Sequence, residues 1–98
     1  MRHLIIHPEA ETEMLQAADF YERQQKVLRK RFLAAVKDGF TRPQINPLLY
    51  PLVGASVRRC LIRTFPFGVV FRVLDGEITV ISVMHLRRDP EHWKGRNS

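Results

Sequence analysis

Residues 57–84 read VRRCLIRTFPFGVVFRVLDGEITVISVM, and this stretch decides the fold. It divides into three apolar runs, Val57 to Phe65, Gly68 to Leu74 and Ile78 to Met84, separated by Pro66 and by Asp75-Gly76. An Asp-Gly pair between two apolar runs is a strong hairpin signal, because both central positions of such a tight turn need a positive φ. The stretch therefore predicts an antiparallel three-stranded meander.

The third run is apolar on both of its faces. In a strand, alternate side chains point to opposite sides of the sheet. A run that is apolar on both sides therefore has to be shielded from water on both faces of the sheet. We expect Ile78 to Met84 to be a central strand, with helices on one face and the C-terminal tail or a partner on the other.

The N-terminal part predicts a strand followed by helical structure. Residues 3–6 are short and apolar, and His7-Pro8-Glu9 then begins a helix with proline and acidic residues in its first turn. Residues 9–40 permit one long helix or two, since no glycine or proline interrupts their middle. We expect two helices that meet near Gln24-Gln25, because a single amphipathic rod would leave its apolar stripe partly uncovered.

Gly39 and Pro43 are expected to end the helical stretch, and Thr41 to Ser56 to form a packed irregular connection. After the meander, Asp89-Pro90-Glu91 predicts a short helical turn that carries Trp93. The expected order is β-α-α-β-β-β. Helices segregated from an antiparallel sheet define an α+β fold, here a single domain over residues 1–98.

Composition predicts an ordinary globular chain with an excess of arginine. The net charge is +6, and twelve of the sixteen basic residues are arginines. A solvated basic surface explains net charge alone more simply than a dedicated nucleic-acid site. The single cysteine, Cys60, allows no internal disulfide and is expected to be buried. The start carries no secretory signal pattern and no stretch is long enough to span a bilayer, so we expect a soluble protein of the cytoplasm.

Basic side chains gather around the meander. If the first strand alternates, Arg59 and Arg63 share one face with Leu61, while Arg58 lies on the other. Such cations can grip phosphates or an acidic peptide, or they can simply pair with nearby carboxylates, which is the explanation we prefer for Arg72 alone. The cations expected to contribute are Arg58, Arg59, Arg63, Arg72, Arg87 and Arg88.

His85, at the end of the third run, could exchange a proton near neutral pH, although a strand-end histidine is more often a hydrogen-bonded structural residue. The four histidines show no zinc-type spacing, and no Gly-rich phosphate loop, nucleophile elbow or carboxylate pair is present. We therefore expect neither a metal site nor a cofactor.

Two short elements, Arg63-Thr64-Phe65-Pro66-Phe67 and His85-Leu86-Arg87-Arg88-Asp89-Pro90, occur in this order and are followed by Trp93. Together with the helical hairpin and the proline-rich connection, they resemble the RelE/ParE toxin superfamily over nearly the whole chain. The resemblance implies the toxin of a type II toxin–antitoxin, or plasmid stabilisation, module that a cognate acidic antitoxin neutralises. A homodimer through the helical hairpin would also fit such proteins.

The resemblance leaves the target open between two branches. RelE-like members cut messenger RNA on the ribosome with a set of basic side chains, whereas ParE-like members poison DNA gyrase. Arg59 matches one basic position of the RNA-cleaving set, but Leu61 and Gly68 stand where further cations would be expected. We therefore favour gyrase binding over enzymatic activity. RNA cleavage stays open, with His85, Arg59 and Arg88 as candidate catalytic residues, as does a non-toxic interaction module of the same fold.

Target or antitoxin binding is expected at the arginines of the meander and the tail. The set comprises Arg58, Arg59, Arg63, Arg72, Arg87, Arg88 and Trp93.

Overall fold

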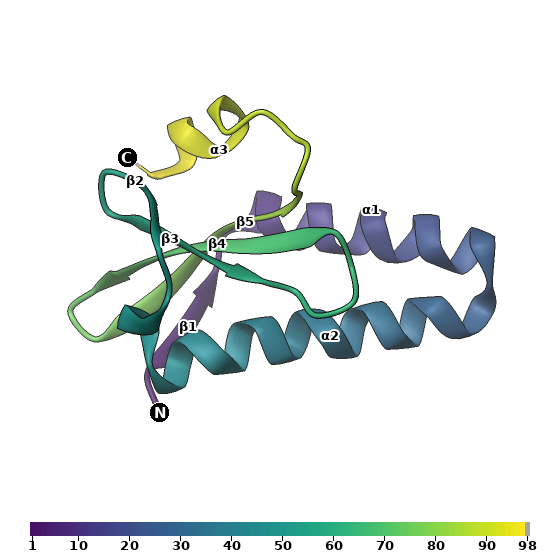
Figure 1. Ribbon diagram of the computed structural model, residues 1–98, viewed down its shortest axis with the longest axis horizontal. Helices are drawn as coiled ribbons and strands as arrows, with labels where there is room; N and C mark the ends of the chain where they lie inside the picture. The colour runs from purple at the N-terminus through teal and green to yellow at the C-terminus, as the bar shows by residue number, and fades with distance from the viewer. Residues whose placement is uncertain (98) are drawn as a thin grey trace.

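The computed structural model describes residues 1–97 as a helical hairpin packed on a mixed sheet, with a short helical tail on the opposite face (Figure 1). In chain order the elements are β1 (His3–Ile6), α1 (Pro8–Gln24), α2 (Lys26–Ile45), the 3-10 turn η1 (Pro47–Leu49), β2 (Leu52–Gly54), β3 (Val57–Leu61), β4 (Phe67–Leu74), β5 (Glu77–His85), α3 (Glu91–Lys94) and the 3-10 turn η2 (Gly95–Asn97).

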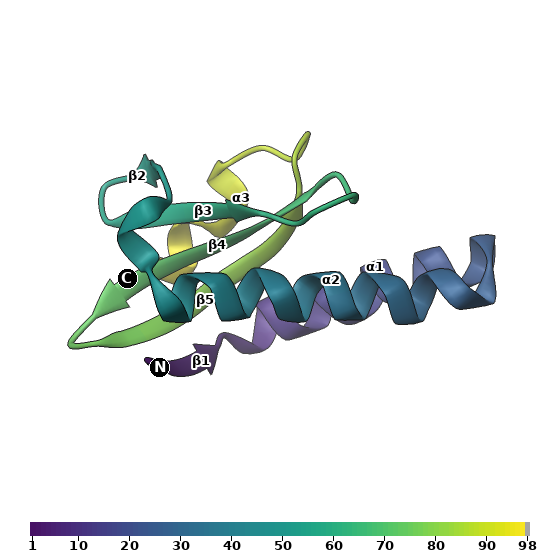
Figure 2. The ribbon, with the colours of Figure 1, turned by 60° about the horizontal axis from the view of Figure 1, so that its bottom comes forward.

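The sheet contains five strands in the order β1-β5-β4-β3-β2. Strands β3, β4 and β5 form the predicted antiparallel meander, β2 adds an antiparallel edge strand, and β1 pairs in parallel with β5. Figure 2 shows the helical hairpin beneath the sheet, with α3 on its other side. The α+β fold predicted from the sequence is confirmed.

The helical stretch divides where the sequence predicted. Gln25 has an extended backbone, with φ −166° and ψ 130°, so it separates α1 from α2. Its N–H still donates to the Tyr21 carbonyl at 3.0 Å, which satisfies a carbonyl of the last turn of α1. At the other end of α1, the His7 ring accepts a hydrogen bond from the Glu9 N–H at 3.1 Å and caps the helix.

The predicted end of the second helix is wrong, since α2 continues through Gly39 and Pro43 to Ile45. Gly39 serves packing, because a Cβ there would lie 3.1 Å from Cγ2 of Val69. The helix can therefore approach the sheet closely at this point. Pro43 is buried close to the end of the helix. Tertiary packing outweighs the local helix-breaking tendency of both residues.

Two predictions for the strands are also corrected. β3 ends at Leu61, so Arg63 lies in the following turn and does not line up with Arg59. Thr64 in that turn has a φ of 68°, a left-handed conformation that no strand accommodates. The connection from 41 to 56 contains β2, which was missed because Pro51 and Gly54 are poor strand formers.

The two faces of the sheet bury separate apolar clusters. The larger cluster lies between sheet and hairpin and includes Phe32, Val69 and Phe71. The smaller one places Trp93 of α3, 3% exposed, against Val70 and Ile81. β5 is thus a central strand covered on both faces, as its apolar pattern predicted. No helix within residues 1–97 is long and apolar enough to cross a membrane.

Candidate functional site

The loop that follows β5 is held tightly and presents two arginines. The Arg88 N–H donates to the His85 carbonyl at 3.0 Å, and the Leu86 N–H donates to the Pro66 carbonyl at 2.9 Å. Nδ1 of His85 accepts from the Arg87 N–H at 3.1 Å. These bonds fix the turn, and both arginine side chains are exposed.

Arg88 shares a small hollow with Arg59 and Trp93. We call this the arginine hollow; it has a volume of about 140 Å³ and is lined by Val53, Arg59, Val70, Met84, Leu86, Arg88, Pro90 and Trp93. Its walls are mainly apolar, so electrostatic attraction to an anion entering it is less screened than on an open surface. Two guanidinium groups beside such walls can bind a carboxylate or a phosphate.

The side chain of Arg59 depends on Gly68 of the neighbouring strand. A Cβ at Gly68 would lie 3.0 Å from both Cγ and Cδ of Arg59. The arginine stem therefore lies across the bare backbone of β4. Its Nε is buried without a hydrogen-bond partner. A buried donor without a partner is unfavourable, and this favours a ligand that supplies an acceptor.

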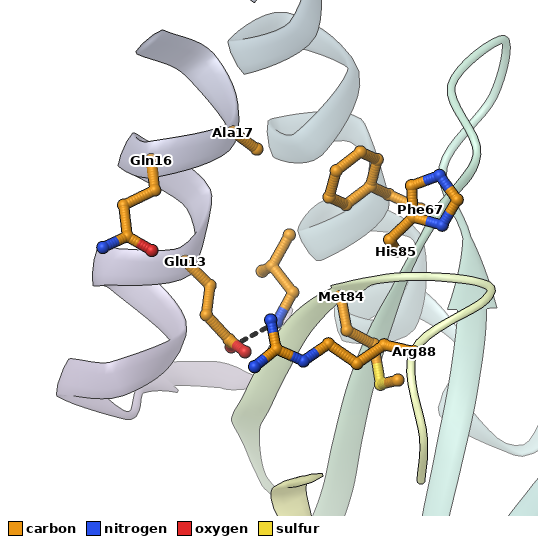
Figure 3. A pocket seen from close by; sticks show the side chains of 8 residues that line it. Glu13, Gln16, Ala17, Phe67, Met84, His85 and Arg88 are labelled. Carbon is orange, nitrogen blue, oxygen red and sulfur yellow. Dashed lines mark hydrogen bonds between the residues drawn. The ribbon is translucent and has the colours of Figure 1, made fainter. Parts of the chain in front are cut away.

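A second cavity, of about 240 Å³, lies between α1 and the end of β5. Figure 3 shows Arg88 reaching from the loop across this cavity toward α1, with the His85 ring beside Phe67. The rings of Phe67 and His85 meet edge to face, with centroids 5.3 Å apart. Arg88 therefore borders both cavities, and His85 borders this one.

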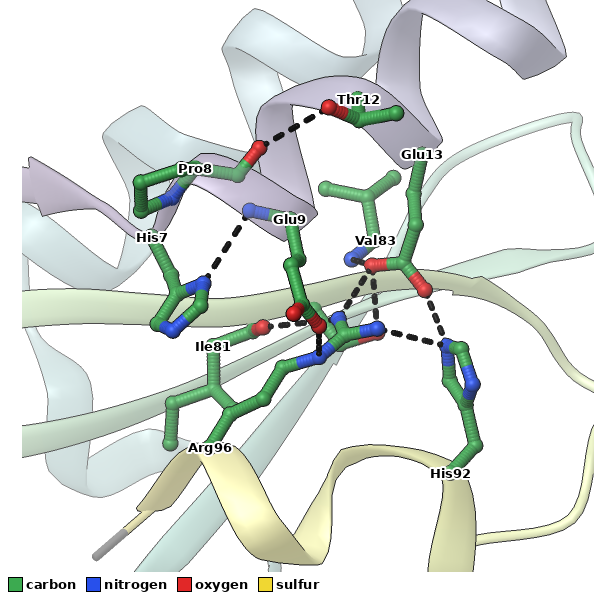
Figure 4. A network of polar contacts seen from close by, with 10 residues as sticks. His7, Pro8, Glu9, Thr12, Glu13, Ile81, Val83, His92 and Arg96 are labelled. Carbon is green, nitrogen blue, oxygen red and sulfur yellow. Dashed lines mark hydrogen bonds and ion pairs between the residues drawn. The ribbon is translucent and has the colours of Figure 1, made fainter.

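A polar network around Glu13 anchors the tail that carries Trp93 (Figure 4). The Glu13 carboxylate accepts from the Ser82 hydroxyl at 2.9 Å, from the Val83 N–H at 3.2 Å and from Arg96 at 2.8 Å. It also contacts Nε2 of His92. Arg96 in turn donates to the Ile81 carbonyl at 3.2 Å. Because β1 pairs only with Glu77 to Val80, Glu13 and Arg96 bind the part of the β5 edge that has no strand neighbour.

The same contacts set the protonation of Glu13. Burial by itself would raise the pKa of this carboxyl, but hydrogen bonds from Arg96, His92 and Ser82 outweigh burial and hold the pKa below its ordinary value. Glu13 is therefore ionised at neutral pH and acts as an acceptor for all of its partners.

The structure brings together only part of the predicted set. Arg59, Arg88 and Trp93 line one hollow, His85 lies at the adjoining cavity, and Arg72 is on the same face of the sheet as Arg59. The other three cations lie apart: Arg58 bonds to the Tyr50 carbonyl away from the hollow, Arg63 lies in the β3–β4 turn, and Arg87 lines neither cavity.

Sequence reasoning missed the two residues that position the tail, Glu13 and Arg96. Their hydrogen bond joins positions 83 residues apart, so no local pattern could reveal it. Cys60 is buried as expected, and burial raises the pKa of its thiol. Within residues 1–97 no group of three or more His, Cys, Asp or Glu side chains is placed to hold a metal ion.

The family match defines the class to which the protein belongs, and the fold agrees with it. A solved structure described as "Chromosomal ParDE TA system from P. aeruginosa" superposes with a TM-score of 0.67 at 22% sequence identity, covering 87% of this chain and 96% of that chain. A family described as "ParE toxin of type II toxin-antitoxin system, parDE" matches residues 4–90. No curated protein sequence matches.

The chain belongs to the ParE toxin family. It is therefore the toxin component of a type II toxin–antitoxin system, and this membership implies an antitoxin as its partner.

Proposed function

We propose that this toxin acts in the cytoplasm by binding DNA gyrase, with the arginine hollow and the loop beside it as the contact surface. The observation that carries the proposal is the convergence of Arg59 and Arg88 on one apolar-walled hollow. Neither arginine takes part in an ion pair within residues 1–97. A carboxylate or phosphate of the target would supply the missing partner.

Membership of the ParE family supports gyrase over the ribosome, and so does the packing at Gly68. The resemblance to RNA-cleaving toxins places a cation at this position. Any larger side chain there would displace the stem of Arg59. Leu61, at another expected basic position, is apolar and half exposed. With glycine at position 68 and leucine at position 61, Arg59 lacks the neighbouring cations that an RNA-cleaving set requires.

RNA cleavage is the second candidate function, favoured by the cavity that His85 and Arg88 share. However, Nδ1 of His85 accepts a backbone hydrogen bond. In the neutral ring the proton must then lie on Nε2, which can donate but cannot accept a proton. Neutral His85 is thus unsuited to be the general base that activates a 2′-hydroxyl.

The deciding experiment compares the two targets with purified toxin. We expect inhibited supercoiling and gyrase-linked DNA breaks, and no cleavage of messenger RNA on translating ribosomes. Ribosome-dependent cleavage without an effect on gyrase would overturn the proposal in favour of an endonuclease. Activity on neither target would leave a non-toxic interaction module.

The site is tested with Arg59→Ala combined with Arg88→Ala. Removing two charge-assisted bonds should weaken gyrase inhibition and growth inhibition by roughly 10- to 100-fold, with thermal unfolding close to that of the wild type. Arg23→Ala is the matched control, since Arg23 is exposed at the end of α1 and far from the hollow along the chain. Full toxicity in a folded double variant would reject the site.

We also propose a homodimer through the helical hairpin. Phe20 and Val27, near the hairpin turn, are 50% and 42% exposed and could pack against a second copy. A Phe20→Ser variant should remain monomeric in light scattering at concentrations where the wild type forms dimers. A wild type that is monomeric throughout would reject this dimer.

A further inference from the structure

Four strongly exposed apolar side chains gather in the segment that joins α2 to β3. Ile45, Leu48, Leu49 and Leu52 are 63%, 70%, 72% and 58% exposed. Among the described residues, every other exposed large apolar side chain except Met1 and Leu74 is at most 50% exposed. These four residues lie within eight positions of the sequence, and Leu48 and Leu52 line the same hollow. Exposed apolar groups of this kind commonly mark interaction sites. We call these four residues the apolar patch.

The backbone beneath the apolar patch is fixed. Pro47 is fully buried, and the Tyr50 ring packs edge to face on Phe71 with centroids 6.1 Å apart. Arg58 donates to the Tyr50 carbonyl at 2.7 Å, and the Arg59 N–H donates to the Pro51 carbonyl at 3.1 Å. The leucines are therefore displayed by a rigid support, which lowers the entropy lost when a partner binds them.

The surface beside the apolar patch is hollowed and cationic. Leu48 and Leu52 line a hollow of about 460 Å³ together with Val73 and Arg58. At the other end of the patch, Arg2 donates to the Ile45 carbonyl at 3.1 Å. A partner would therefore meet an apolar floor with a guanidinium at each end.

Charge decides between the kinds of partner. Arg58 lines the hollow beside the apolar patch and Arg2 bonds to the Ile45 carbonyl, whereas no aspartate or glutamate among the described residues lines that hollow. A second copy of this chain, with a net charge of +6, would bring cations against cations at this surface. A segment with an apolar face and acidic flanks matches both the leucines and the arginines.

We propose that the apolar patch and the hollow beside it dock an acidic, apolar-faced segment of the antitoxin, apart from the arginine hollow that contacts the target. The proposal rests on the toxin–antitoxin assignment and does not depend on which target the toxin has. Antitoxin binding and toxicity should then be separable by mutation. Variants of the apolar patch should lose antitoxin binding, and variants of the arginine hollow should lose toxicity.

The test uses Leu48→Asp combined with Leu52→Asp in the full chain. The binding probe is the purified acidic protein encoded by the reading frame next to the toxin gene. We expect its affinity to fall roughly 100-fold, because two buried apolar contacts become charges that face acidic residues. Wild-type affinity should also fall as salt is raised. Growth inhibition in cells without the antitoxin should be unchanged, and so should the melting temperature, since both side chains are exposed.

Leu15→Asp is the matched control, because Leu15 is an exposed leucine on α1, outside the apolar patch, and 40% exposed. Equal losses of affinity in the control and the patch variant would overturn the proposal, as would unchanged binding by a folded patch variant. If the wild type and the control form dimers and the patch variant is monomeric, the patch binds a second copy of the toxin and not the antitoxin. If gyrase proves not to be the target but the patch variant alone escapes the antitoxin, the proposed target fails and the docking surface stands.

Discussion

At the scale of single residues, the site depends on one glycine that makes room for one arginine. Gly68→Ala would place a methyl group 3.0 Å from the stem of Arg59, which must then shift by a few tenths of an ångström within the hollow. We expect several-fold weaker inhibition of the target and a change in unfolding free energy of about 1 kcal/mol or less, because a flexible side chain can relieve the overlap.

Gly95→Ala is the control for this prediction, since a Cβ at Gly95 meets nothing within 4 Å. Target inhibition and urea unfolding of both variants would be measured together. Wild-type inhibition by Gly68→Ala would show that the exact position of the Arg59 stem is unimportant.

A single carboxylate, Glu13, should also give the protein an acid-labile tail. Its pKa lies below the ordinary value of 4.5 in the folded state, so the folded state binds protons less readily than the unfolded chain. The stabilisation it provides is complete above pH 4.5 and is lost as the pH falls through the lowered pKa. Trp93 is the only tryptophan and is buried, so its emission should shift to the red over this acid range.

Glu13→Gln tests the assignment. At neutral pH it should cost about 1–3 kcal/mol of unfolding free energy, because Arg96 loses one of its two charged acceptors and keeps only Glu9. Its Trp93 emission should then depend less on pH than that of the wild type. A variant with the full acid transition of the wild type would show that other carboxylates release the tail.

At the scale of elements, local chemistry predicted the structure where an element is determined by its own residues. The hairpin at Asp75-Gly76 is present, with positive φ at both positions, and the helices separate at Gln25. The prediction failed where tertiary contacts decide. Gly39 is retained inside α2 because Val69 lies against it, and β2 exists because β3 offers a partner edge.

The helical hairpin is held by an aromatic cluster around Phe32. This ring is fully buried on α2 and lies 5.1–5.2 Å from the rings of Tyr21, Phe65 and Phe67. Phe32→Ala should cost about 3–5 kcal/mol of unfolding free energy, because a large cavity remains at the helix–sheet interface. Leu15→Ala, at a side chain that is 40% exposed and lies outside the aromatic cluster, should leave the denaturation midpoint almost unchanged. Equal midpoint shifts for the two variants would place Phe32 outside the core.

At the scale of the whole molecule, the sequence predicted that cations would gather but not how they divide among surfaces. Alternation along a strand placed Arg58 and Arg59 on opposite faces of the sheet. It could not show that Arg59 lines a hollow with Arg88, or that Arg58 lines another with Leu48 and Leu52. Both hollows depend on contacts between distant parts of the chain: the first forms where the C-terminal tail packs back on the sheet, and the second forms beside β2. No local sequence pattern predicts either contact. Cations that the strand pattern gathered around the meander therefore divide between two hollows.

Trp93 of the C-terminal tail has two roles: it belongs to the smaller apolar cluster, and it lines the arginine hollow. Trp93→Ala should cost about 3–5 kcal/mol by exposing Val70 and Ile81, and it should weaken target inhibition by widening the hollow. Lys94→Ala, one residue further and exposed, should change neither quantity measurably. The measurements are urea unfolding and gyrase inhibition at a temperature where both variants are folded. Loss of stability with full inhibition would assign Trp93 to the core alone and leave the hollow to its two arginines.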